Sequence, residues 1–260
     1  MLIKQRIILI SFVESIFMKK HIPNSLTLLN LFSGCCGIIA AMQQQYIWVP
    51  IIIGISLVAD FLDGFVARAL HVKSELGGQL DSLADMVTFG VLPGVLLFNV
   101  IGSSNSIINK HCTTICSTDY LQYLGFIYTI FACLRLAKFN IDTRQTVNFI
   151  GLNTPACCIF ILGFYMHFFS EWQYSFNPEI FSYSKYFAIA VSFILAYLAV
   201  AEIEIFSLKG NPFNWKENKM RVLFLISIIP QAIFLEWIGL STIILSYVFF
   251  AILHNSTQKN

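Results

Sequence analysis

The chain has 260 residues, of which 57% are hydrophobic and only 12% are charged, and its mean hydropathy is +0.73. About a quarter of the residues of a soluble domain are charged, so this composition excludes an ordinary soluble protein. The formal net charge of +2 is too small to favour nucleic-acid binding. We therefore expect an all-α, polytopic membrane helix bundle.

The first twenty residues, MLIKQRIILISFVESIFMKK, combine a basic start with an apolar run, as a signal peptide does. Glu14 interrupts the run, and no small-residue cleavage site follows it. We therefore predict that residues 1–20 form an amphipathic helix at the membrane surface. A translation start at Met18 is the alternative interpretation.

Eight apolar stretches follow, each close to the ~20 residues that a helix needs to cross a bilayer. They cover residues 26–43, 47–69, 80–101, 120–140, 152–170, 185–205, 221–237 and 238–254. The last two stretches adjoin, and the sequence Leu235-Glu236-Trp237 is the only break in this apolar region. This indicates a tight helical hairpin. We divide the chain after its N-terminal segment into a six-span core, residues 21–205, and a C-terminal hairpin, residues 206–260.

Lysine and arginine are distributed unevenly over the connections between these spans. With the N-terminus in the cytoplasm, fourteen of the sixteen Lys and Arg residues fall on the cytoplasmic side, and only Lys110 and Lys185 fall on the other. Cytoplasmic loops carry an excess of these residues. The asymmetry therefore predicts an even number of spans with both termini in the cytoplasm. Cys112 and Cys116 would then flank an extracytoplasmic loop, where a disulfide or, less simply, a metal pair is an option.

Four carboxylates occur where the second predicted span ends and the third begins, in the sequence DFLDGFVARALHVKSELGGQLDSLAD. Asp60 and Asp63 share one helical face because they are three residues apart, and Asp81 and Asp85 share a face because they are four apart. The connection over residues 70–79 is short, so the two helices are expected to be antiparallel neighbours. The four carboxylates then converge from facing helices.

Four carboxylates this close would repel one another, and their ionisation in a membrane is costly. Divalent cations relieve both effects, and carboxylate oxygens suit Mg²⁺ or Mn²⁺. Gly64 and Ala67 are small residues that keep the Asp60/Asp63 helix face narrow. Arg68 can bind a phosphate, and Gly77 permits close approach to the backbone just before the third span. This combination suits a diphosphate ligand and metal-assisted phosphoryl transfer.

Two other interpretations of the carboxylates remain. Membrane carboxylates also serve as helix-packing groups, and they line the paths of cation or proton transporters. Transporter sites are typically near the middle of the membrane, whereas this cluster is predicted at one interface.

The spacing Asp60-x-x-Asp63-Gly64-x-x-Ala67-Arg68, followed by Gly77-x-x-x-Asp81-x-x-x-Asp85, resembles the signature of the CDP-alcohol phosphatidyltransferase family at all eight fixed positions. The segments IPNSLTLLNLFSGCCGIIA, DSLADMVTFGVLPG and RLAKFN, the last followed by GLNTPA, resemble the bacterial membrane-type phosphatidylserine synthases of that family. The resemblance covers roughly residues 20–160. It implies the CDP-alcohol phosphatidyltransferase fold in a bacterial inner membrane, with the active site facing the cytoplasm.

The resemblance also implies a reaction and the residues that perform it. The hydroxyl of L-serine would attack the β-phosphate of CDP-diacylglycerol, giving phosphatidylserine and CMP. The implied metal ligands for Mg²⁺ or Mn²⁺ are Asp60, Asp63 and Asp81, while Asp85 would be the general base and also touch a metal. The implied nucleotide-site residues are Gly64, Ala67, Arg68 and Gly77. The family further implies a homodimer.

The choice of acceptor depends on other residues. Arg135 and Lys138, at the predicted cytoplasmic end of the fourth span, are placed to receive the carboxylate of serine; anchoring at the membrane edge is the alternative. Sister enzymes that use glycerol 3-phosphate tend to carry an arginine where this chain has Leu29 and Asn30. In AEIEIFSLKGN, Glu202 and Glu204 stand where more neutral residues are expected, which leaves the role of the sixth span open.

Overall fold

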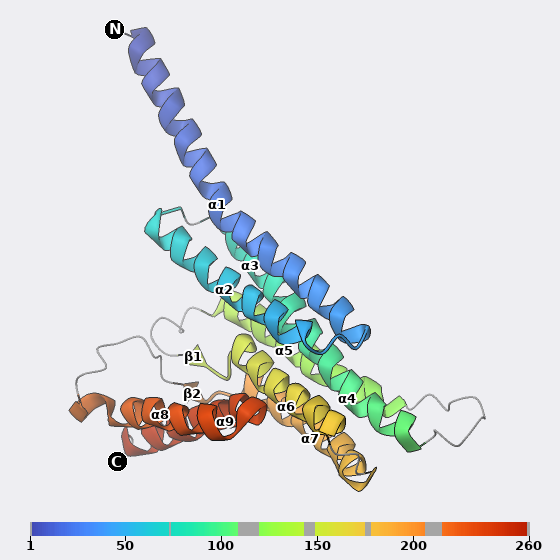
Figure 1. Ribbon diagram of the computed structural model, residues 1–260. Helices are drawn as coiled ribbons and strands as arrows, with labels where there is room; N and C mark the ends of the chain where they lie inside the picture. Colours follow the sequence, from blue (N-terminus) through green and yellow to red (C-terminus); the bar gives the residue numbers. More distant parts are fainter. Residues whose placement is uncertain are drawn as a thin grey trace.

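A computed structural model describes residues 2–72, 74–108, 120–142, 149–174, 178–205 and 215–258. Within these ranges the chain is almost entirely helical (Figure 1). The α-helices are α1 (Leu2–Met42), α2 (Trp48–Ala69), α3 (Glu75–Asp85), α4 (Leu92–Ile108), α5 (Phe126–Ile141), α6 (Thr154–Tyr174), α7 (Pro178–Val200), α8 (Trp215–Phe234) and α9 (Glu236–Gln258). The other elements are the π-helix η1 (Met86–Val91), the 3₁₀-helix η3 (Tyr120–Gly125) and the strands β1 (Phe149–Ile150) and β2 (Glu204–Ile205).

The predicted bundle of membrane helices is confirmed. Five helical stretches are long and apolar enough to cross a membrane, namely His21–Met42, Trp48–Ala69, Glu75–Ser103, Tyr120–Ile141 and Glu236–Asn255. Three shorter apolar helices are Thr154–Phe169, Ser184–Val200 and Met220–Phe234. Taken in chain order, these stretches correspond to the eight predicted spans. Cys112 and Cys116 lie outside the described residues, so their disulfide or metal pair stays a prediction.

The N-terminal segment is not separated from the first span. Helix α1 is continuous from Leu2 to Met42, with Pro23 inside it. Figure 1 shows the first part of α1 projecting beyond the other helices. The surface location proposed for residues 1–20 stays a prediction.

The centre of the bundle is formed by η1 and α4 together with α6. More of the stretch Glu75–Ser103 is buried than of the other four candidate spans. Leu92, Leu96 and Leu97 of α4 and Ile161 and Tyr165 of α6 are fully buried. The sequence LPGVLLFNVIG of α4 is apolar on all sides, as is typical of a membrane-spanning or buried helix.

The π-helix η1 begins directly after Asp85. Side chains of α5 bind the backbone carbonyls of this segment: the Tyr128 hydroxyl donates to Phe89 O at 2.7 Å, and the Thr129 hydroxyl donates to Gly90 O at 3.0 Å. Single π-turns inside α-helices are uncommon and frequent at functional sites. Here the neighbouring helix α5 supplies hydrogen bonds that hold the irregular turn in place.

Two short strands, which the sequence did not predict, join the segment before α6 to the segment after α7. β1 and β2 are antiparallel, with Ile150 opposite Glu204. Gly151 N–H donates to Ile203 O at 2.9 Å. Gly151 has a φ of +75°, and a Cβ there would lie 2.6 Å from Ala199 O. Only glycine fits this close approach without strain.

The predicted C-terminal hairpin is present, and its turn is at Leu235 between α8 and α9. α9 packs on α6 of the core, where the Ser241 hydroxyl donates to Phe160 O at 2.7 Å. At Gly163 of α6 a Cβ would lie 2.8 Å from Leu240 Cβ, so the absent side chain permits close helix packing. The hairpin therefore contacts the core directly, and the division at residue 206 stays a prediction.

Candidate active site

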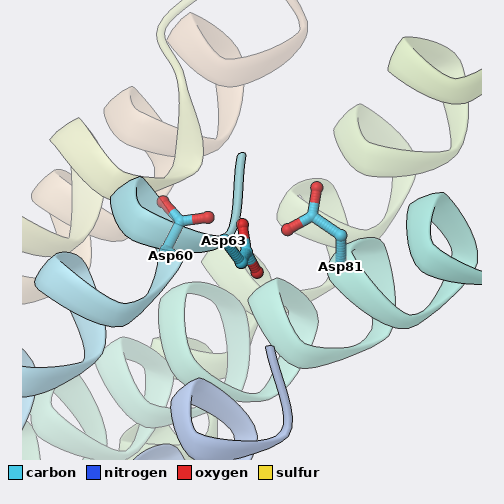
Figure 2. A group of neighbouring side chains, drawn as sticks. All are labelled: Asp60, Asp63 and Asp81. Atoms are coloured by element: carbon cyan, nitrogen blue, oxygen red, sulfur yellow. The ribbon is translucent and has the colours of Figure 1, made fainter. Parts of the chain in front are cut away.

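Three of the four predicted carboxylates form one compact group. α2 carries Asp60 and Asp63, and α3 carries Asp81; one ligand oxygen of each lies within 4.8 Å of the other two. Figure 2 shows the carboxylates of Asp60 and Asp81 approaching each other from the two helices, with Asp63 between them. Among the described residues, the buried Asp81 Oδ1 accepts no hydrogen bond. A divalent cation would satisfy such an atom, so the group fits Mg²⁺ or Mn²⁺.

The local sequence explains why these helix ends face each other. α2 ends as His71 adopts a φ of +54°, in the left-handed region. Ser74 then caps α3, because its hydroxyl accepts a hydrogen bond from Gly77 N–H at 3.0 Å. This cap begins α3 at Glu75 and places Asp81 fewer than two turns into the helix. The short connection thus sets the register between the two acidic faces.

Asp63 is supported from α1. It is only 6% exposed, and the Thr27 hydroxyl donates to Asp63 Oδ2 at 2.5 Å. Thr27 is itself buried. Groups that hydrogen-bond to a metal ligand orient it and tune its affinity. Thr27 is placed to do this for Asp63.

Asp85 does not belong to the compact group. Its Oδ1 accepts a hydrogen bond from Asn30 Nδ2 at 3.2 Å, and Asn30 is fully buried in α1. The Thr88 hydroxyl of η1 donates to Asn30 O at 3.1 Å and so links η1 to α1 as well. Asp85 is thus oriented by Asn30 outside the compact group, which suits a general base. Its additional role as a metal ligand stays a prediction.

The predicted nucleotide residues line one pocket beside the compact group. This first pocket has a volume of about 260 Å³ and is lined by Pro23, Asn24, Thr27, Asp63, Gly64, Ala67, Arg68, Val72, Ser74, Gly77, Gly78 and Asp81. A Cβ at Gly77 would lie 3.0 Å from Ser74 Oγ and 3.2 Å from Asn24 Oδ1. A Cβ at Gly64 would lie 3.3 Å from Arg68 Nη1. Both glycines therefore keep the pocket open.

Arg135 and Lys138 line a second pocket, with a volume of about 340 Å³. Arg135 is only 6% exposed, and its Nε–H donates to Leu152 O at 2.6 Å. This burial contradicts the alternative that Arg135 anchors the helix at the membrane edge. Among the described residues, Arg135 Nη2 is buried and has no hydrogen-bond partner. Helix α5, which carries Arg135, also packs against η1, the turn that begins directly after Asp85.

The sequence analysis did not identify every polar residue of the two pockets. Asn24, Thr27 and Asn30 of α1 all lie near the acidic helix ends, and their spacing of three residues in an otherwise apolar span was an available signal. Asp142 and Glu202 line the second pocket. No local spacing connects these two residues, because they come from distant segments.

Comparison with known proteins agrees with this geometry. Residues 20–201 match the family model described as CDP-alcohol phosphatidyltransferase. This chain belongs to the CDP-alcohol phosphatidyltransferase family. The match includes the first pocket and all of the second except Glu202, so the predicted family is confirmed. Family membership also favours transferase chemistry over the cation-transporter interpretation.

Three relatives illustrate the similarity, and each is named CDP-diacylglycerol–serine O-phosphatidyltransferase. The protein from Helicobacter pylori strain J99 is 32% identical over 142 residues, which are 54% of this chain and 55% of that protein. The Bacillus subtilis strain 168 protein is 33% identical over 146 residues, 55% of this chain and 76% of its own length. The Methanocaldococcus jannaschii protein is 32% identical over 143 residues, 55% of this chain and 59% of its own. The matches thus span little more than half of two of these relatives.

Proposed function

We propose that this protein transfers the phosphatidyl group of CDP-diacylglycerol to the hydroxyl of L-serine, giving phosphatidylserine and CMP. The observation that carries the proposal is the compact Asp60–Asp63–Asp81 group, two members of which, Asp63 and Asp81, line a pocket together with Arg68. The names of the relatives support CDP-diacylglycerol and serine as the two substrates.

Asp60, Asp63 and Asp81 would hold the divalent cation, Mg²⁺ or Mn²⁺. When bound, the cation would neutralise the diphosphate and stabilise the charge that develops as CMP leaves. Thr27 keeps Asp63 oriented through its hydrogen bond. The first pocket would receive the nucleotide, with Gly64, Ala67 and Gly77 leaving room for it and Arg68 facing its phosphates.

Asp85 would remove the proton from the serine hydroxyl as that oxygen attacks the phosphorus bearing the diacylglycerol. A bond forms between the serine oxygen and this phosphorus, and the bond from the phosphorus to the CMP oxygen breaks. Asn30 orients the Asp85 carboxylate. An unactivated alcohol is a weak nucleophile, so a positioned base accelerates the attack.

Arg135 and Lys138 would bind the serine carboxylate in the second pocket. The burial of Arg135 with an unpartnered Nη2 among the described residues supports this assignment, because a ligand carboxylate accepts hydrogen bonds from such a nitrogen. The cytoplasmic orientation of the site rests on the distribution of Lys and Arg. A location in the bacterial inner membrane, contact of the site with membrane lipid, and a homodimer are inferred from the family.

Membranes containing the full chain test the proposal. CMP release from CDP-diacylglycerol is expected only with Mg²⁺ or Mn²⁺ and with serine, and phosphatidylserine should form in equal amount. Glycerol 3-phosphate and inositol, supplied separately, serve as control acceptors. Release of CMP with glycerol 3-phosphate but not with serine would assign the chain to a sister activity. Metal uptake into vesicles without CMP release from any acceptor would favour a transporter.

A further inference from the structure

The second pocket contains charges of both signs. Arg135 and Lys138 contribute positive charge, and Asp142 and Glu202 contribute negative charge. We propose that Glu202 binds the ammonium group of the acceptor, so that the second pocket recognises an α-amino acid zwitterion and rejects acceptors that carry only negative charge. The inference rests on the proposed function and names the residue that determines its acceptor specificity.

The backbone explains how Glu202 and Arg135, from distant segments, come to line one pocket. Arg135 Nε–H donates to Leu152 O at 2.6 Å, and Leu152 N–H donates to Leu198 O at 2.9 Å near the end of α7. The pairing of β1 with β2 holds the chain on the far side of Glu202. Glu202 therefore lies in a short connection fixed at both ends, between α7 and β2. The same backbone network positions the arginine and the glutamate.

The burial of Arg135, whose buried Nη2 has no hydrogen-bond partner among the described residues, indicates that the second pocket binds an anionic group. Burying an unpaired guanidinium nitrogen is costly, whereas a ligand carboxylate accepts such hydrogen bonds well. Exposed Lys138 lines the same pocket and adds a second positive charge. An anion alone would nevertheless be repelled by Glu202 and Asp142.

A small zwitterion resolves this conflict, because its carboxylate and ammonium are attached to one carbon atom. The carboxylate pairs with Arg135, and the ammonium is attracted to Glu202, which lines the same pocket. The hydroxymethyl group is then the remaining substituent, and the proposed reaction requires it to be presented to Asp85. Glycerol 3-phosphate lacks the ammonium and carries more negative charge, so Glu202 disfavours it.

The test compares acceptors and two matched variants in membranes containing the full chain. Glu202→Gln removes the charge at nearly constant size, and we expect KM for serine to rise about tenfold while KM for CDP-diacylglycerol is unchanged. 3-Hydroxypropionate is serine without its ammonium. The ratio of kcat/KM for serine to that for 3-hydroxypropionate should fall about tenfold in the variant. Glu204→Gln is the control, because Glu204 is an exposed glutamate like Glu202 but is not among the described residues that line the pocket.

The outcomes separate this inference from the proposed function. Wild-type turnover of serine, together with equal acceptor ratios in Glu202→Gln and Glu204→Gln, would overturn the role of Glu202 alone. A wild-type protein that uses another alcohol and not serine would overturn the proposed function itself. If Glu202→Gln does not accumulate, Glu202→Asp supplies the test, because the shorter carboxylate should raise KM for serine alone. An unchanged KM in that variant would contradict the inference.

Discussion

The two pockets of this protein are assembled in different ways. The first is formed mainly from one helical hairpin, in which α2 and α3 supply Asp63, Arg68, Gly77 and Asp81 within a short stretch of chain. The second combines residues of α5 with Glu202 beyond α7, joined through backbone hydrogen bonds and a two-residue strand pair. The comparison suggests that metal and nucleotide chemistry resides in a local motif, whereas acceptor choice depends on tertiary contacts.

The largest expected effect is in the first pocket. Asp81→Asn should lower CMP release about 10⁴-fold, because an amide is a weaker ligand and the metal supplies several kcal/mol of transition-state stabilisation. Removal of divalent cations with EDTA should abolish the wild-type activity, and added Mg²⁺ should restore it. Glu75→Gln is the control, an exposed acid on the same helix. Comparable activity of Asp81→Asn and Glu75→Gln would contradict the metal-site assignment.

Substitution of Asp85 should affect the chemical step more than the binding of CDP-diacylglycerol. Asp85→Asn should lower kcat roughly 10³-fold because it removes the base that accepts the serine proton. It should retain CDP-diacylglycerol binding better than Asp60→Asn, since Asp85 lies outside the compact carboxylate group. Single-turnover kinetics and nucleotide binding measure the two effects. Activity of Asp85→Asn equal to that of the wild type would exclude the general-base role.

Substitutions in the second pocket should change KM for the acceptor, serine. Arg135→Lys keeps the positive charge but loses the planar guanidinium and the hydrogen bond to Leu152 O. We expect KM for serine to rise about thirtyfold with little change in KM for CDP-diacylglycerol. Lys138→Gln should have a smaller effect, because Lys138 is exposed and its charge is screened. A larger effect of Lys138→Gln than of Arg135→Lys would reverse the proposed order of the two residues.

The smallest expected effect concerns the hydrogen bond from Thr27 of α1 to Asp63 of the compact carboxylate group. Thr27→Val removes the hydrogen bond to Asp63 with little change in shape. The Mg²⁺ concentration for half-maximal activity should rise about tenfold, as is typical when support of a metal ligand is lost. Ser25→Ala is the control, because the Ser25 hydroxyl is exposed and donates to His21 O within its own helix. An unchanged Mg²⁺ requirement in Thr27→Val would show that Thr27 serves packing alone.

The hydrophobic pattern was sufficient to predict most of the fold. Each membrane helix satisfies its own backbone hydrogen bonds, so length and hydropathy locate it without knowledge of its neighbours. The helical hairpin at Leu235 was therefore predictable, as were the eight apolar stretches. The π-helix after Asp85 was not, because it depends on hydrogen bonds from Tyr128 and Thr129 of another helix.

The sequence by itself determined the family, the acidic hairpin and the residues proposed for chemistry, since helical spacing and a short connection bring Asp60, Asp63 and Asp81 together locally. Tertiary structure alone decided that Asp85 accepts a hydrogen bond from Asn30, that Arg135 is buried, and that Glu202 lines the same pocket as Arg135. The physical reason is the range of the interactions. Helical periodicity acts within a few residues, whereas the Arg135–Leu152–Leu198 hydrogen bonds and the β1–β2 pair join segments that are far apart in the sequence.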